Sequence, residues 1–200
     1  MYIMADPLYL SLWFSHFTQS DMMPRLLSVV RQLMFSGLRP GISAVAVHPV
    51  SWSEPTILER RFRPGIDPEQ AIAIVGDMLH PDYAYLVEGY WDLWVPSEET
   101  GEWVVEPRPV KFIAHSLDFD DGAYQESGHI QVDFGLDTPF LFDDVELNDT
   151  TEPRVRANVQ KLVNFTNAVE KNCGIGGRVL WSESEENLAQ KLISRLQKTH

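Results

Sequence analysis

Apolar and polar residues alternate over several short stretches in the first 95 residues. This period of two predicts strands over residues 8–17, 42–49, 56–62 and 83–95. Between them, apolar residues recur at helical spacing over 21–34 and 67–80. Gly37 follows the first of these stretches, and Asp67-Pro68 is a typical start for the second. The order β-α-β-β-α-β is that of the ferredoxin-like fold, in which two helices cover one face of an antiparallel sheet.

The second half continues this mixture of strands and helices. Strands are expected over 103–119, where Pro107 and Pro109 indicate an edge or a bend, and over 128–136. Residues 137–152 read as a loop with an apolar centre at 140–142 that must pack against the core. A helix is expected from Glu152-Pro153 to Cys173, then a strand over 178–181. Ser182-x-x-Glu185 has the pattern of a capping box for a last helix.

These elements predict an α+β fold class: a ferredoxin-like βαββαβ N-terminal half, extended by antiparallel strands and two C-terminal helices. A chain of 200 residues suits a single domain over 1–200. A subdivision into a ferredoxin-like half, 1–95, and an appended half of hairpin and helices, 96–200, is the alternative.

The composition is that of an ordinary globular protein, with 44% hydrophobic and 22% charged residues. The apolar stretch 7–17 is too short to span a bilayer and no basic segment precedes it, so we expect neither a membrane segment nor a secretory signal. The single cysteine, Cys173, cannot form an internal disulfide. This favours a reducing compartment, and we predict a cytoplasmic location.

Negative charge is concentrated in one segment. Residues 112–153 contain no Lys or Arg and supply −11 of the formal net charge of −13. Such a local field selects partners more sharply than a diffuse charge does. The eleven acids are Asp118, Asp120, Asp121, Glu126, Asp133, Asp137, Asp143, Asp144, Glu146, Asp149 and Glu152.

The charge balance disfavours nucleic-acid phosphates and anionic membranes as partners. The run Glu59-Arg60-Arg61-Phe62-Arg63 is the one basic cluster, and it is better interpreted as the end of a strand.

Two glycine-containing segments resemble ligand-binding loops, but neither meets the requirements of such a loop. The segment 118–122 lacks the Gly and Glu positions of an EF-hand, which favours a turn. The segment 174–177 closes a helix, whereas a phosphate loop must open one, which favours a helix C-cap. No cofactor is predicted.

The catalytic signals are weak. The six histidines show no metal-binding spacing, so no metal is predicted. His16 with His48, and His115 with His129, are two pairs that strand pairing would bring together as an acid/base site with a nearby Asp, although an isolated strand histidine is more often structural. Cys173 ends a helix, where the dipole disfavours a thiolate. Catalytic residues stay unknown, and whether the chain is an enzyme stays open.

Two functional interpretations remain. The first is a non-enzymatic protein-interaction module that binds a basic protein through a negative surface at 118–152, as immunity proteins do, with aromatic anchors from the strand at 83–95. The candidate partner-binding residues are Asp120, Asp121, Asp143, Asp144, Glu146, Tyr90 and Trp94. The aromatic face is also a candidate homodimer interface. The alternative is an enzyme or small-molecule binder with a His/Asp site between the two halves. The simplest explanation of the acidic segment is that it only makes the surface soluble.

Overall fold

The structure is a computed structural model, and it describes residues 5–142, 147–183 and 187–197. The strands are β1 (Pro7–Trp13), β2 (Ile42–Pro49), β3 (Leu58–Ile66), β4 (Tyr83–Pro96), β5 (Trp103–His115), β6 (Ile130–Leu136) and β7 (Gly177–Ser182). The helices are α1 (Gln19–Val30), α2 (Pro68–Gly76), α3 (Tyr124–Ser127), α4 (Thr138–Leu141), α5 (Glu152–Asn172) and α6 (Leu188–Leu196), with a 3-10 turn, η1, at Phe119–Asp121.

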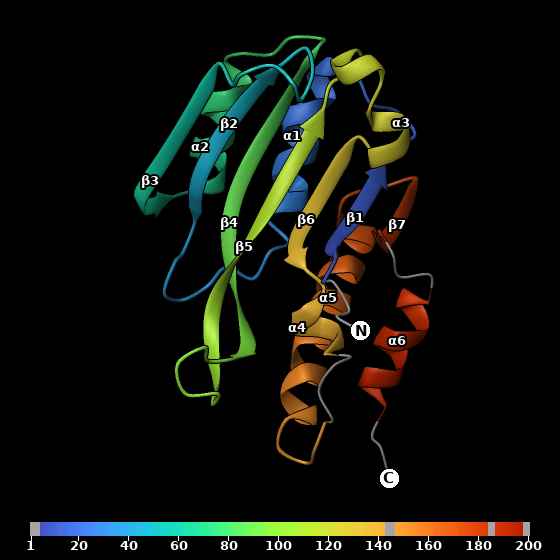
Figure 1. Ribbon diagram of the computed structural model, residues 1–200. Coiled ribbons are helices and arrows are strands. Elements are labelled where there is room, and N and C mark those ends of the chain that lie inside the picture. The colour runs from blue at the N-terminus through green and yellow to red at the C-terminus, as the bar shows by residue number, and fades with distance from the viewer. Residues whose placement is uncertain (1–4, 143–146, 184–186, 198–200) are drawn as a thin grey trace.

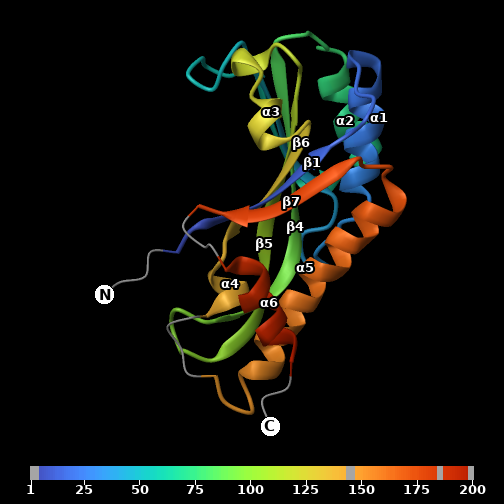
Figure 2. The same ribbon diagram turned by 90° about the vertical axis from the view of Figure 1, so that its right-hand side faces the viewer.

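All seven strands form one sheet in the order β3-β2-β4-β5-β6-β1-β7, and every neighbouring pair is antiparallel (Figure 1). Helices α1, α2 and α5 lie on one side of the sheet (Figure 2). The α+β fold class is therefore confirmed, and strands from both predicted halves share the sheet.

The ferredoxin-like order is not what the sheet shows. That fold places the first strand among the other strands of its own half. Here β1 lies between β6 and β7, far along the sheet from β2, β3 and β4. The local pattern gave the element types correctly, but β1 finds its partners in the second half. Leu8, Leu10 and Leu12 complete the core there and are fully buried.

Two boundaries in the first half differ from the sequence prediction. Helix α1 ends at Val30, so Met34, expected on its buried face, is 72% exposed. Strand β3 continues through Pro64 and Gly65 to Ile66, beyond the end at residue 62 that the sequence predicts. Proline fits because β3 is an edge strand and Pro64 lies between Arg61 and Ile66, where the pairing of β3 with β2 is irregular.

The second half also departs from the prediction at a few points. Helix α6 begins at Leu188 with Asn187 as N-cap, whereas Ser182, the expected cap, ends β7. Glu185 lies outside the described residues. The expected loop at 137–152 contains the short helix α4, and its apolar residues Phe140 and Leu141 are buried as expected.

The β4–β5 hairpin extends beyond the rest of the sheet (Figure 1). Strand β5 pairs with β6 only from Lys111 to Ala114, so Pro107 and Pro109 lie where β5 has β4 as its one neighbour. This confirms the expected edge. Within the hairpin, the buried side chain of Trp91 on β4 packs on Phe134 and Phe140. Among the described residues, no helix is long and apolar enough to cross a membrane.

Candidate functional site

The structure divides the predicted partner-binding residues among several places. Asp120 and Asp121 lie together in η1 and line a pocket at one end of the sheet. Tyr90 and Trp94 lie farther along β4 and do not line that pocket. Asp143, Asp144 and Glu146 lie outside the described residues.

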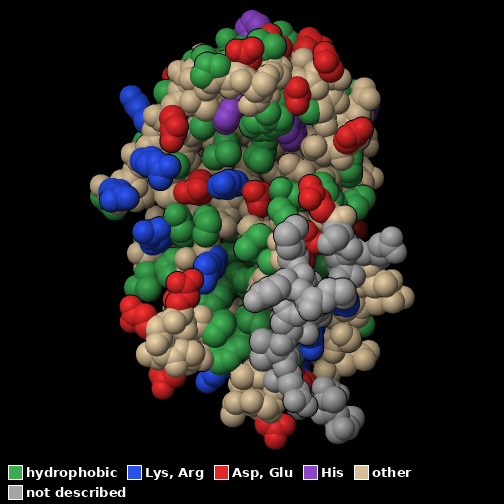
Figure 3. All heavy atoms as spheres, viewed as in Figure 1, with side chains coloured by type: hydrophobic (Ala, Val, Ile, Leu, Met, Phe, Trp, Pro, Cys, Tyr) green, Lys and Arg blue, Asp and Glu red, His purple; other side chains and the backbone are tan. Residues whose placement is uncertain are grey.

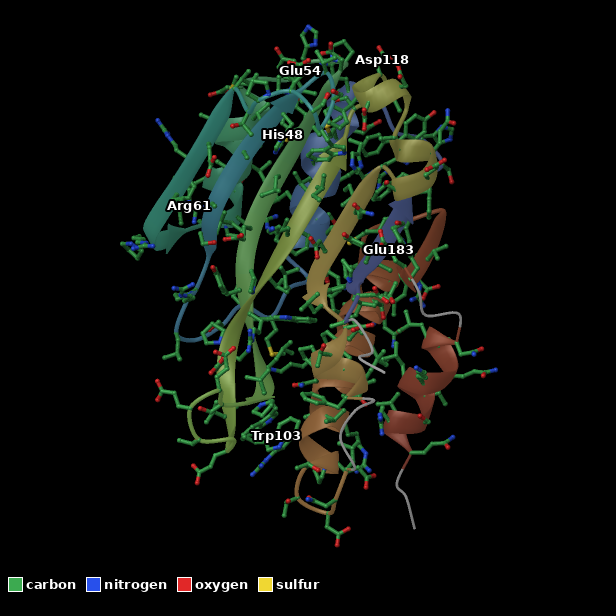
Figure 4. The ribbon with its side chains drawn as sticks, viewed as in Figure 1. His48, Glu54, Arg61, Trp103, Asp118 and Glu183 are labelled. Atoms are coloured by element: carbon green, nitrogen blue, oxygen red, sulfur yellow. The ribbon has the colours of Figure 1, made fainter. Side chains whose placement is uncertain are left out.

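We call the pocket around Asp120 and Asp121 the acid pocket. Its volume is about 530 Å³, and three loops form it: the turn after β2, the α2–β4 loop and the β5–η1 loop. Asp118 and Glu54 are seen at this end of the molecule in Figure 4. Four carboxylates and one histidine line the pocket, and its described lining contains no Lys or Arg. The lining residues are Val50, Ser51, His80, Pro81, Asp82, Asp118, Asp120 and Asp121.

Main-chain hydrogen bonds hold the three loops together. The Asp120 N–H donates to Val50 O at 2.7 Å, and the Val50 N–H donates to Asp82 O at 2.8 Å. The Asp118 N–H donates to Pro81 O at 2.9 Å. Each loop is thus bonded to at least one other, and the backbone positions that carry the four aspartates are fixed relative to one another. This preorganisation lowers the entropy lost when a partner binds.

The backbone of the acid pocket is unusual at three points. Val50, Asp120 and Asp121 have φ values of 62°, 48° and 55°. Aspartate adopts this left-handed region more readily than other side chains do, whereas a β-branched valine there is strained. Such strain persists where the surrounding structure imposes it, which is typical of functional sites.

His80 is a pocket residue that the sequence reasoning missed. Its Nδ1 bonds to Asp82 Oδ1, and its ring stacks on Tyr83. In the sequence, His80-Pro81 was interpreted only as the end of a helix. The signal that was available is the triplet His80-Pro81-Asp82, since a histidine and a carboxylate two residues apart in a turn readily meet.

The four histidines of the predicted acid/base pairs lie elsewhere. His16 and His48 do not become neighbours through strand pairing, because β1 and β2 are separated in the sheet. His115 and His129 are adjacent, since the His115 N–H donates to His129 O at 2.9 Å. None of the four lines the acid pocket or the second pocket described below.

His115 serves a structural role beneath the acid pocket. It is 1% exposed, and its Nδ1 bonds to Gly128 O at 2.9 Å. Trp52 packs edge-on against both His115 and Phe119. Burial lowers the pKa of His115 to about 4, so the ring is neutral at pH 7.

A second pocket, of about 340 Å³, lies at the β3 edge, and we call it the arginine pocket. Arg39, Arg61 and Arg63 line it, together with Ser43, Glu88 and the predicted anchor Tyr90. Arg39 lies over the Tyr90 ring at 4.5 Å. The other predicted anchor, Trp94, is similarly covered by Arg154 at 5.2 Å. Both aromatic rings are therefore already partnered by guanidinium groups of the same chain.

A row of charges crosses the sheet face turned away from α1, α2 and α5. Strand pairing places Glu88 opposite Lys111, and Lys111 opposite Asp133. Figure 3 shows acidic and basic side chains side by side across the middle of this face. The expected aromatic interface is thus interrupted by alternating charge.

Within residues 5–142, 147–183 and 187–197, no group of three or more His, Cys, Asp or Glu side chains is arranged to hold a metal ion. No protein-family model, no curated protein and no solved structure matches the chain.

Proposed function

We propose that this protein is an interaction module that binds a basic partner protein, with the acid pocket receiving a Lys or Arg side chain. The observation that carries the proposal is the set of four carboxylates, supplied by two loops and unopposed by any Lys or Arg of the pocket lining. A cationic side chain is the group that such a field attracts most strongly.

The backbone of the pocket supports a binding role. Main-chain hydrogen bonds join the loops that carry the carboxylates, so the backbone does not need to reorganise when a cation arrives. The attraction between these carboxylates and a bound cation favours association. A purely solubilising surface gains nothing from such convergence. The proposal retains Asp120 and Asp121 from the sequence prediction and adds Asp82 and Asp118.

The test is the binding of short fluorescent peptides, rich in Lys and Arg or neutral, measured by anisotropy at low and physiological salt. We expect the basic peptides alone to bind, with affinity falling as salt rises. The double variant Asp120→Asn and Asp121→Asn should weaken binding roughly ten-fold. Asparagine keeps the shape and accepts the left-handed backbone of both positions.

The matched control is Glu98→Gln with Glu99→Gln. It removes the same charge from the exposed β4–β5 turn, far from the acid pocket. If both double variants weaken binding equally, net charge rather than the pocket is responsible. If wild-type protein binds neutral and basic peptides alike, the proposal is wrong.

A second candidate is an enzyme or small-molecule binder with a His/Asp site between the halves. The His80–Asp82 pair favours it, because an imidazole oriented by a carboxylate is the usual arrangement of a general base. The His80→Gln variant separates the two functions. It should leave basic-peptide binding nearly unchanged if the carboxylates alone bind the partner, whereas it would abolish catalysis that uses this pair.

A further inference from the structure

The arginine pocket is a second candidate site, distinct from the acid pocket. It is formed where the loop after α1 meets the β3 edge and the middle of β4. Figure 4 shows Arg61 on β3, away from the end of the sheet where Asp118 lies, and Figure 3 shows Lys and Arg side chains gathered along this edge.

The three guanidinium groups are poorly neutralised by the protein. Arg61 makes an ion pair with Glu59 at 3.6 Å, but both side chains are largely exposed and the pair is screened by water. Arg39 rests on the Tyr90 ring. Across the described part of the chain, the Arg63 guanidinium has no hydrogen-bond or ion-pair partner.

Edge protection explains only part of this arrangement. Charged residues on an edge strand discourage pairing with other chains, and this accounts for arginines on β3. It does not account for Arg39, which comes from a separate loop and lies over an inner strand. Convergence of three positive charges from two segments is favourable when an anion lies among them.

Backbone packing holds the two arginine-bearing segments together. A Cβ on Gly65 would lie 2.3 Å from Pro40 O and 3.1 Å from Ile42 O, so the α1–β2 loop and β3 touch through their backbones. Arg39 and Arg63 flank this contact in their respective segments. Their spacing is therefore set by the fold and not by side-chain motion alone.

Glu88 adds selectivity within the pocket. Its Oε1 accepts a hydrogen bond from Ser43 Oγ at 2.9 Å, which fixes the carboxylate at the pocket wall. A second negative group on a ligand would be repelled there, whereas an amine or hydroxyl would be bound. The pocket therefore suits a ligand with one oxyanion and one hydrogen-bond donor. Its volume is within the range of small-molecule sites.

We propose that the arginine pocket binds a small molecule that carries one oxyanion group, held by Arg39, Arg61 and Arg63, and one amine or hydroxyl group, held by Glu88. Phosphate and carboxylate are the two oxyanions that guanidinium groups bind in this way. This proposal is independent of the basic partner of the acid pocket.

Four probes test the proposal by calorimetry on the full chain: phosphoethanolamine, β-alanine, ethyl phosphate and propionate. The first two carry an amine and the last two do not, and each pair contrasts phosphate with carboxylate. We expect an amine-bearing probe to bind more tightly than its amine-free counterpart. Whichever of phosphoethanolamine and β-alanine binds more tightly identifies the oxyanion.

The variants locate the site. Arg63→Gln should weaken binding about ten-fold. Arg60→Gln, on the same strand but outside the pocket lining, should not. Glu88→Gln should abolish the preference for the amine and strengthen ethyl phosphate binding. The proposal is overturned if none of the probes binds at millimolar concentration, or if Arg60→Gln and Arg63→Gln weaken binding equally while both variants keep the wild-type unfolding midpoint.

Discussion

The acid pocket is lined by aspartates and the arginine pocket by arginines, and different parts of the fold form the two pockets. In the acid pocket, short side chains extend from three loops, and backbone hydrogen bonds join these loops to one another. In the arginine pocket, long side chains extend from an edge strand and a loop, and one is held by stacking on Tyr90. A net charge of −13 therefore describes neither site, because each local field is set by which segments the fold joins.

The two pockets depend on different supporting contacts in the fold. The acid pocket rests on the buried side chains of His115 and Phe119, over which the partly exposed Trp52 packs edge-on. The arginine pocket rests on the close backbone contact at Gly65. A change to either support should affect one pocket and spare the other.

The largest expected effect is a loss of stability at acid pH caused by His115. Its pKa is about 4 in the folded protein and about 6.5 in the unfolded chain, so the unfolded chain takes up the proton first. The stabilisation is fully present above pH 6.5, falls progressively between pH 6.5 and 4, and is lost once the pH has passed below 4, by about 3 kcal/mol in all. Denaturant unfolding at a series of pH values measures it.

The variant His115→Gln should flatten this pH dependence, whereas His16→Gln, at an exposed position, should not. A residual slope is expected because burial also lowers the pKa of His129. Hydrogen exchange should show the loop around Trp52 opening before β3 as pH falls. Simultaneous opening of both regions would mean that the two pockets do not have separate supports.

The next effect in size concerns the arginine pocket. Gly65→Ala places a methyl group against the carbonyl oxygens of Pro40 and Ile42, and backbone on both sides limits relaxation. We expect the free energy of unfolding to fall by about 2 kcal/mol. Phosphoethanolamine binding should be lost, while basic-peptide binding at the acid pocket should persist. Gly37→Ala is the control, since nothing lies within 4 Å of its added Cβ.

The two pockets also differ in how far the sequence predicted them. Asp120 and Asp121 are consecutive in a turn, so their proximity was visible in the chain. Asp82 and His80 join them because β4 pairs with β5. The sequence predicts that hairpin from the polar turn at 96–102, but not the register that brings the loop before β4 beside the turn after β5. The arginine pocket was missed for the same reason, because Arg39 and Tyr90 meet Arg63 through the β2–β3 and β2–β4 pairings.

The same limit explains the incorrect sheet order. Periodicity reports whether a segment is a strand and which of its faces is buried, but not which strand lies beside it. Pairing of β1 with β6 and β7 joins residues that are far apart in the chain. The cytoplasmic location, the homodimer and the lack of nucleic-acid binding stay predictions.

The smallest effect tests whether the pockets are electrically independent. Glu59→Gln removes the one ion pair of Arg61, and both partners are exposed enough for stability to change little. With this competitor gone, Arg61 is freer to bind an oxyanion, and the dissociation constant for phosphoethanolamine should fall roughly two-fold at low salt. The gain should vanish at high salt, because exposed charges are then screened. Basic-peptide binding at the acid pocket should not change. A parallel change there would show that a shared long-range field, and not two separate pockets, governs binding.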